Sequence, residues 1–274
     1  MALIWFVAAV VLSALGAALL LRAPPFVGAA LYALITLGVA AVKLGGGGVG
    51  GHVVVGKVFI VLVAITYISS FRGTRIHQRR WGRALGVLIF SGSILQLAVT
   101  ELAHQTTGNG LAGVLLVVTI ALPHRLRLEE GRYVHDMGLD WVVAYSVWGA
   151  VYGYVNRGPE GQMGSWAVWA AATVASAWVV ARGRQEAFTE ARVYTLGLFT
   201  AASAVAPDPP VTVLTPELYA PQVAMALHGV ALVAVGVVIV RSVLEARQPG
   251  PPRNLVAWAA RKVMAGGGDG LGVG

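Results

Sequence analysis

The stretch "HVVVGKVFIVLVAITYISSFRGTRIHQRRWGR", residues 52–83, decides the fold class. It begins with an apolar run long enough to cross a lipid bilayer and ends in a burst of arginines, a pattern typical of a helix that emerges on the cytoplasmic side. Within the apolar run stands one lysine, Lys57, where a helix that faces lipid should carry no charge.

The composition extends this pattern to the whole chain. Of its 274 residues 57% are hydrophobic and only 12% are charged, and the mean hydropathy is +0.74. Because a span needs about 20 apolar residues, the chain has length for many crossings and little left for an aqueous domain. We expect an all-α transmembrane bundle over residues 1–245, followed by a cytoplasmic tail over residues 246–274.

Apolar runs of sufficient length predict about nine spans. They lie near residues 2–21, 26–42, 53–71, 84–103, 109–123, 138–155, 164–181, 187–206 and 219–240.

Basic residues sort onto alternate connections between these spans. Lysine and arginine concentrate in cytoplasmic loops, so the sorting predicts an outside amino terminus, a cytoplasmic carboxyl terminus and a place in the cytoplasmic membrane. One side receives 17 of the 20 basic residues, namely Arg22, Arg72, Arg75, Arg79, Arg80, Arg83, Arg125, Arg127, Arg132, Arg182, Arg184, Arg192, Arg241, Arg247, Arg253, Arg261 and Lys262. The other side receives Lys43 and Arg157, and Lys57 lies within a span.

The tail after the last span contains a short amphipathic pattern. Leu255, Trp258 and Val263 alternate with basic residues that include Arg261 and Lys262. This predicts a helix lying on the anionic lipid of the inner leaflet, with a solvated tail as the alternative. The glycine-rich end that follows is expected to be disordered.

Polar residues near the outer ends of the spans form a candidate vestibule. A charge at mid-span costs about 2.5–3.5 kcal/mol on translocon scales, so Lys57 is expected to face protein or water. Either Lys57 belongs to a site for a small solute or ion, or it snorkels to the interface and pairs with Glu101 merely to register two helices. The further candidates for this vestibule are Gln96, His104, Asn109 and His228, although His228 taken alone favours a packing role.

Aromatic residues form one face of the sixth span. Trp141, Tyr145, Trp148 and Tyr152 follow each other at helical spacing. Such a stripe usually packs against protein or lipid, and less often lines a pocket for an aromatic or quaternary ammonium ligand. We therefore keep Tyr145, Trp148 and Tyr152 as binding candidates.

Acidic residues on the inner side have two interpretations. Asp136 and Asp140 lie one helical turn apart, so they are either a cation or proton site or acids that favour a helix amino terminus. Glu186, Glu190 and Arg192 begin the eighth span, where an ion-pair network is the plain interpretation.

The sequence contains no motif typical of metal binding, cofactor binding, known catalytic sites or nucleic-acid binding. The chain has no cysteine, its six histidines are scattered, and it contains no recognised catalytic motif, so we expect no metal site and no cofactor. The arginines form no groove with interleaved aromatics, and the sorting of charge already accounts for them, so nucleic acid is not expected as a partner.

Four segments resemble, in the same order, helices of an uncharacterised bacterial multi-pass membrane family known only as a domain of unknown function. They are "GKVFIVLVAITYISSFR", "NGLAGVLLVVTI", "LDWVVAYSVWGAVYGYVNR" and "ARVYTLGLFTAAS", within residues 53–205. The best matching pieces are Lys57, Asn109-Gly110, Ala144, Tyr145, Trp148 and Tyr152. Where the family places an acid and an asparagine, this chain has Ser146 and Gly149, which puts any activity of that acid in doubt here. The family brings no established activity, so the resemblance implies only the membrane fold and a role for Lys57.

Three functions remain open from sequence. The leading hypothesis is transport or conduction of a small solute or ion through an outward polar cavity, because a nearly loopless chain must act among its helices. The alternatives are a membrane-embedded enzyme acting on a lipid or quinone, and a non-catalytic subunit or assembly factor.

Overall fold

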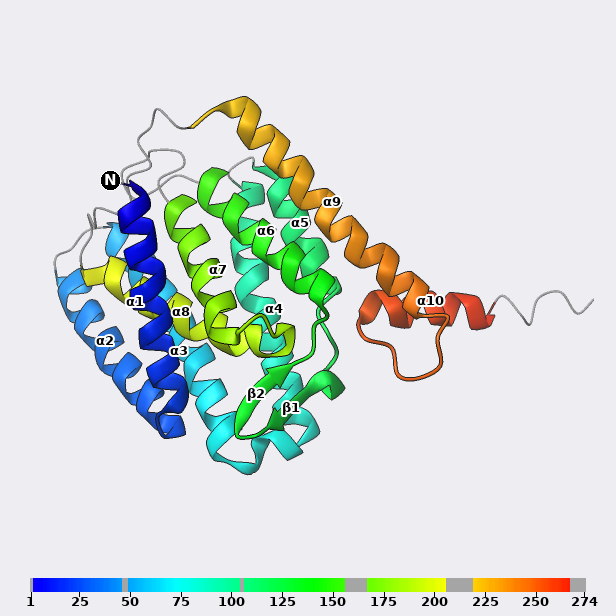
Figure 1. The fold of residues 1–274 in the computed structure, drawn as a ribbon, viewed down its shortest axis with the longest axis horizontal. Coiled ribbons are helices and arrows are strands. Elements are labelled where there is room, and N and C mark those ends of the chain that lie inside the picture. The colour runs from blue at the N-terminus through cyan, green and yellow to red at the C-terminus, as the bar shows by residue number, and fades with distance from the viewer. Residues whose placement is uncertain (1, 46–48, 104–105, 156–166, 206–218, 267–274) are drawn as a thin grey trace, which may run out of the picture.

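A computed structural model describes residues 2–45, 49–103, 106–155, 167–205 and 219–266 (Figure 1). The helices are α1 (Ala2–Arg22), α2 (Pro25–Gly45), α3 (Val49–Gly73), α4 (Arg80–Ala103), α5 (Thr107–Val118), α6 (Leu139–Val155), α7 (Ala167–Ala181), α8 (Gln185–Val205), α9 (Pro221–Glu245) and α10 (Leu255–Gly266). Two short 3₁₀ turns, Arg75–Gln78 and Pro123–Arg125, and two strands, β1 (Leu126–Glu129) and β2 (Arg132–His135), complete the described elements.

Four helices are long and apolar enough to cross a membrane. The segments are Pro25–Lys43, Val55–Gly73, Arg80–Ala103 and Pro221–Glu245. Shorter apolar helices cover Phe6–Arg22, Thr107–Val118 and Ala170–Ala181. The prediction of a helical membrane protein is thereby confirmed in its general form.

The outer surface of the bundle is largely apolar. Large apolar side chains such as Leu12, Leu34, Leu37, Leu88 and Val233 are more than two-thirds exposed. In water such a surface would aggregate, whereas in a bilayer it contacts acyl chains without cost. The exposed apolar residues therefore belong to the lipid-facing side of the helices.

Helix α8 lies in the middle of the bundle and organises it. It packs against α1, α2, α3 and α7, and also contacts α6 and β2. Its first half is almost entirely buried, including Thr189, Glu190, Arg192 and Thr195. Helix α8 is thus enclosed by other elements of the bundle, which explains why it carries polar residues that no lipid-facing helix would tolerate.

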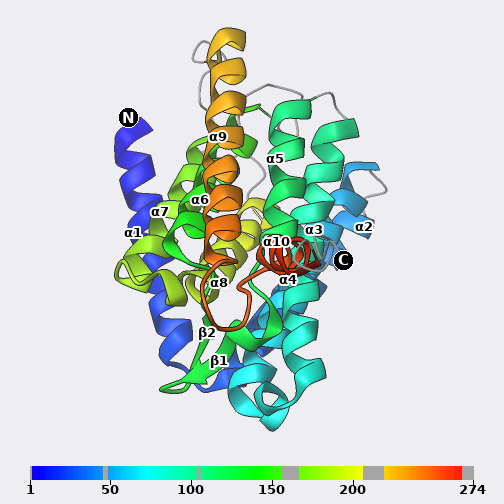
Figure 2. The same ribbon diagram turned by 90° about the vertical axis from the view of Figure 1, so that its right-hand side faces the viewer.

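The opposite side of the bundle is built on α6. Helix α6 packs against α5, α7 and α9, and α9 stands along α5 and α6 (Figure 2). The aromatic face of α6 is buried here, since Trp141, Tyr145 and Trp148 are at most 6% exposed. The rings of Trp141 and Tyr145 stack at 5.2 Å. The stripe is therefore core packing rather than lipid contact.

The connection between α5 and α6 corrects the expectation of an all-helical chain. Strands β1 and β2 pair antiparallel in the register Leu126↔His135 to Glu129↔Arg132. The turn residues Glu130 and Gly131 have positive φ angles of 50° and 74°, the conformation that a two-residue hairpin requires. The alternating "LRLEEGRYVH" carries this signal, although it contains no apolar run long enough for a span.

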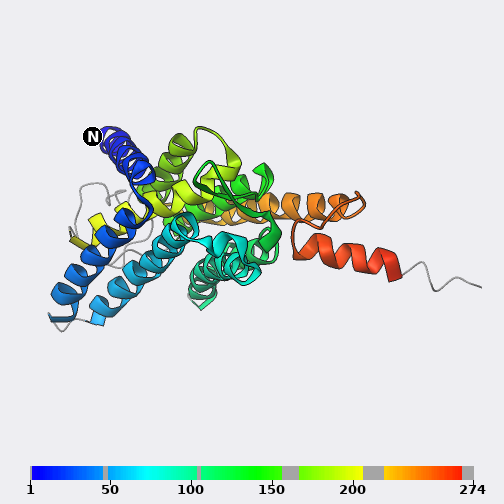
Figure 3. The ribbon, with the colours of Figure 1, turned by 90° about the horizontal axis from the view of Figure 1, so that it is seen from below.

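The tail forms the expected helix. Asn254 caps α10, because its Oδ1 accepts a hydrogen bond from the Ala257 N–H at 2.9 Å. The Asn254 amide also donates to the Thr119 carbonyl and to Ser242, which fastens the start of α10 to α5 and α9. Beyond that anchor α10 extends away from the bundle (Figure 3). The final glycine-rich residues, 267–274, lie outside the described residues.

Candidate functional site

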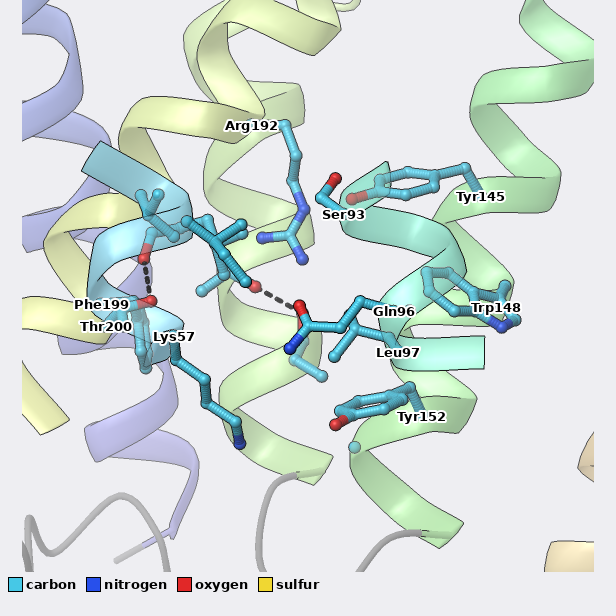
Figure 4. Close-up of a pocket in the computed structure, with 17 residues that line it drawn as sticks. Lys57, Ser93, Gln96, Leu97, Tyr145, Trp148, Tyr152, Arg192, Phe199 and Thr200 are labelled. Atoms are coloured by element: carbon cyan, nitrogen blue, oxygen red, sulfur yellow. Dashed lines mark hydrogen bonds between the residues drawn. The ribbon is translucent and has the colours of Figure 1, made fainter. Parts of the chain in front are cut away.

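A cavity of about 190 Å³ lies among α3, α4, α6, α7 and α8 (Figure 4). Five residues predicted for the site line it together: Lys57, Gln96, Tyr145, Trp148 and Tyr152. They come from the consecutive helices α3 and α4 and from the more distant α6, so the folded bundle brings them to one space.

Arg192 also lines this cavity, which corrects its predicted place in the inner ion-pair network. Residues two apart on a helix point about 200° apart, so Arg192 must face away from Glu190. Figure 4 shows its guanidinium directed into the cavity. Helix geometry could have supplied this signal from sequence, because Glu190 and Arg192 could never share a face.

The guanidinium of Arg192 is buried without a described ionic partner. The residue is 6% exposed, and its Nε and Nη1 atoms have no hydrogen-bond acceptor in the part of the chain that the structure describes. Its Cζ atom lies 6.0 Å from the centroid of the Tyr145 ring, which supplies a cation–π contact. No Asp or Glu is within ion-pair distance of it among the described residues.

The cavity is closed at Arg192 and open at Lys57. Arg192 is buried, whereas Lys57 and Gln96 are exposed. In Figure 4 the Lys57 ammonium lies toward the opposite end of the cavity from Arg192, with the Gln96 amide between their levels. The two cations therefore mark the mouth and the deep end of one space.

Three hydroxyl groups in the cavity wall already donate to their own helices. Ser93 donates to the Phe90 carbonyl at 2.8 Å, Thr173 to Ala170 at 2.9 Å and Thr200 to Leu196 at 2.8 Å. The indole N–H of Trp148 is likewise used, because it donates to the Asn109 carbonyl at 3.0 Å. These groups have no hydrogen left to offer a ligand.

Glu101 and Asn109 form a second polar centre, outside the cavity lining. The Asn109 amide donates to Glu101 Oε1 at 2.6 Å, and both residues are fully buried. The ion pairs between described residues do not include Lys57 with Glu101, so the predicted pairing is not found. The contact of Glu101 with Asn109 instead links α4 to α5 and, through Trp148, to α6.

The remaining vestibule candidates are not brought into the cavity. His228 lies on α9, and its ring contacts the backbone of α5 at Gly108, where an added Cβ would meet it at 2.8 Å. It is therefore a packing residue between α5 and α9. His104 lies outside the described residues.

The two inner aspartates each meet an arginine. Asp136 pairs with Arg125 at 3.2 Å. Asp140, in the first turn of α6, accepts two hydrogen bonds from Arg253, at 3.0 and 2.9 Å. They do not converge as a cation site, and the Asp140 pair instead holds the tail against the start of α6.

The glutamates of α8 differ in burial. Glu186 is partly exposed and pairs with Arg184 at 3.1 Å. Glu190 has no exposed surface and lies between Arg132 at 2.6 Å and Arg72 at 3.6 Å. Both glutamates thus form ion pairs in the structure, and Glu190 joins α3, α8 and the hairpin.

The hairpin contributes a buried histidine beside this network. His135 has no exposed surface, and its Nε2 contacts the Ala121 carbonyl at 3.1 Å. Burial lowers the pKa of His135 from 6.5 to about 4, because the charged ring loses more solvation free energy than the neutral ring when it leaves water. His135 is therefore neutral at physiological pH and donates from Nε2.

The cavity combines positive charge with an aromatic and aliphatic wall. Its lining carries Lys57 and Arg192 and includes no Asp or Glu among the described residues. Among the described residues, moreover, no three or more His, Asp or Glu side chains form a group able to hold a metal ion. The arrangement offers hydrogen-bond donors and positive charge to a bound molecule, without a carboxylate to act as base.

Comparison of the chain with family models, with curated proteins and with solved structures gives no match, and the resemblance to the multi-pass family stays a prediction.

Proposed function

We propose that this chain is a multi-pass protein of the cytoplasmic membrane that binds a small solute in the cavity and moves it across the bilayer. One observation carries the proposal: Lys57 and Arg192, from helices far apart in sequence, both line a single cavity inside a bundle with an oily exterior. Ionisable groups inside a membrane domain are costly and mark solute or ion pathways.

The positions of Lys57 and Arg192 along their helices support passage of a solute across the bilayer. Lys57 lies eight residues into α3 and Arg192 seven residues into α8. At 1.5 Å per residue they stand about 10–12 Å from the starts of their helices. In the proposed topology of nine crossings α3 enters from outside and α8 from the cytoplasm, so Lys57 is the cation nearer the outer face and Arg192 the cation nearer the cytoplasmic face.

The proposed topology is open to a direct test, because the chain contains no cysteine and a single introduced thiol is unique. We expect Thr107→Cys to react with a membrane-impermeant maleimide on intact spheroplasts, and Arg75→Cys to react only after permeabilisation. Labelling of Arg75→Cys from outside would contradict the arginine-based orientation.

The tail fits a place on the inner leaflet. On α10, Leu255, Trp258 and Val263 are at least half exposed, and the Lys262 ammonium lies 6.0 Å from the centroid of the Trp258 ring. An apolar face beside basic residues binds anionic lipid by burial and by charge. The lipid partner of the protein is therefore proposed to be anionic phospholipid on the cytoplasmic side.

Flux in proteoliposomes tests the transport function. The purified full chain is reconstituted, and uptake of small anions, cations and protons is followed under imposed gradients. We expect flux above that of empty liposomes, reduced by Lys57→Ala and by Arg192→Gln. Arg184→Gln is the matched control, since Arg184 belongs to the same inner region and its side chain is 54% exposed.

No flux of any solute would refute transport. A change in membrane lipids or quinones in cells that lack the protein would then favour the enzyme alternative.

A further inference from the structure

The chemical class of the solute can be inferred from the cavity, and this inference rests on the cavity being the solute site proposed above. The described lining carries two positive charges and no negative one. A cation at the buried end of this space would meet the like charge of the Arg192 guanidinium in a poorly solvated place, whereas an anion there would neutralise it. The charge of the wall therefore selects against cations.

Arg192 supplies the place where the anion binds. Its Nε–H and Nη1–H groups are buried and lack acceptors among the described residues, and unsatisfied buried donors of a charged group are costly. The hydroxyl donors of Ser93, Thr173 and Thr200 in the cavity wall are already used by backbone carbonyls. An acceptor placed at the deep end of the cavity is thus offered the guanidinium fork, which matches the two oxygens of a carboxylate, beside the hydroxyl of Tyr145.

The rest of the wall is suited to an apolar body of limited size. Tyr145, Trp148, Tyr152 and Phe199 supply aromatic surface around the cavity. A dry cavity of about 150 Å³ in another protein holds one benzene molecule. The space of about 190 Å³ here therefore accommodates one ring and one small polar group, and not the acyl chains of a phospholipid.

We infer that the cavity binds a small monocarboxylate with a ring-sized apolar body, its carboxylate on Arg192 and its entry favoured by Lys57 at the open end. Lys57 attracts the anion toward the mouth, and Arg192 holds it in a fixed orientation against the aromatic wall. The ligand would also accept hydrogen bonds from the buried Nε–H and Nη1–H groups of Arg192, which have no acceptor among the described residues.

Binding of benzoate to the purified full chain in detergent tests this inference, by equilibrium dialysis with radiolabelled ligand at pH 7.5. Benzyl alcohol and benzylamine are the neutral and cationic probes of similar shape. We expect saturable binding of benzoate and at least tenfold weaker binding of the other two, because a hydrogen-bonded charge contributes roughly that factor or more.

Variants locate the site. Arg192→Gln is expected to weaken benzoate binding about tenfold or more, Arg192→Lys to retain part of the affinity because it keeps the charge, and Arg184→Gln to leave it unchanged. The melting temperature of each variant is measured in the same samples. A variant that keeps or raises its melting temperature and still loses benzoate shows that the loss is one of binding rather than folding.

Three outcomes would overturn the inference: no saturable binding of benzoate, equal binding of benzyl alcohol or benzylamine, or undiminished binding to Arg192→Gln. Binding of phosphatidylglycerol in nanodiscs with no binding of benzoate would also overturn it, in favour of a lipid head group. Benzoate binding that depends on Arg192, without any flux in liposomes, would sustain this inference and refute transport. Flux of cations without benzoate binding would sustain transport and refute the carboxylate inference.

Discussion

Replacing Arg192 by methionine should make the protein more stable. Nε and Nη1 of this 6%-exposed residue have no acceptor among the described residues, and each unsatisfied buried donor costs about 1–3 kcal/mol. The substitution loses the cation–π contact with Tyr145, which at 6.0 Å contributes about 1–2 kcal/mol. Methionine fills similar space with a flexible apolar chain. The net change is therefore a gain of up to about 5 kcal/mol in the free energy of unfolding, and of roughly 2–3 kcal/mol at the middle of these ranges.

Arg72→Met is the matched control with the opposite sign. Arg72 is buried to a similar degree, with 7% of its side chain exposed, but it pairs with Glu190 at 3.6 Å and donates to the Leu21 carbonyl at 2.9 Å. Removing one partner of a buried pair costs about 3–5 kcal/mol.

Thermal unfolding in detergent micelles, followed by tryptophan fluorescence, measures both changes. We expect a higher midpoint for Arg192→Met and a lower one for Arg72→Met, by several degrees each, since about 1 kcal/mol corresponds to roughly 2–4 °C for a chain of this size. Equal destabilisation by the two substitutions would mean that contacts within the protein stabilise the Arg192 guanidinium. This result would refute a ligand site at Arg192.

Three further outcomes are expected. Glu190→Gln should lower the free energy of unfolding by about 3–5 kcal/mol, since it leaves Arg72 and Arg132 facing a neutral amide, and chemical denaturation should detect it. His135 should make the protein less stable in acid. Its pKa is about 4 in the folded protein and 6.5 in the unfolded chain. Its contribution to the free energy of unfolding is therefore full above pH 6.5 and falls by on the order of 2 kcal/mol between pH 7 and pH 5. His135→Gln should flatten that part of the pH–stability curve, and an unchanged curve would rule His135 out as its cause. Asn254→Ala should free the start of α10, so that trypsin cleaves at Arg261 faster than in the parent protein, and equal cleavage rates would contradict the proposed anchor.

The general architecture follows from local properties that a sequence displays. Long apolar runs must form helices in lipid because every backbone group has to be hydrogen-bonded within its own segment. That rule, applied to runs such as residues 53–71 and 219–240, predicted helices that the structure places at Val49–Gly73 and Pro221–Glu245. The amphipathic period of the tail likewise predicted α10. The hairpin at Leu126–His135 was missed because its short alternation carries no apolar run.

The sequence by itself determined that the chain forms apolar helices and that a charge at Lys57 is costly in lipid, and it placed the aromatic residues Tyr145, Trp148 and Tyr152 on one helical face. Only the tertiary structure decided which of these residues meet. It placed Arg192 in the cavity with Lys57, moved His228 to a helix contact and joined Glu101 to Asn109. The reason is physical: burial cost depends on a residue's own chemistry, whereas partnership depends on how helices rotate and pack against each other, and contacts between distant segments set that rotation.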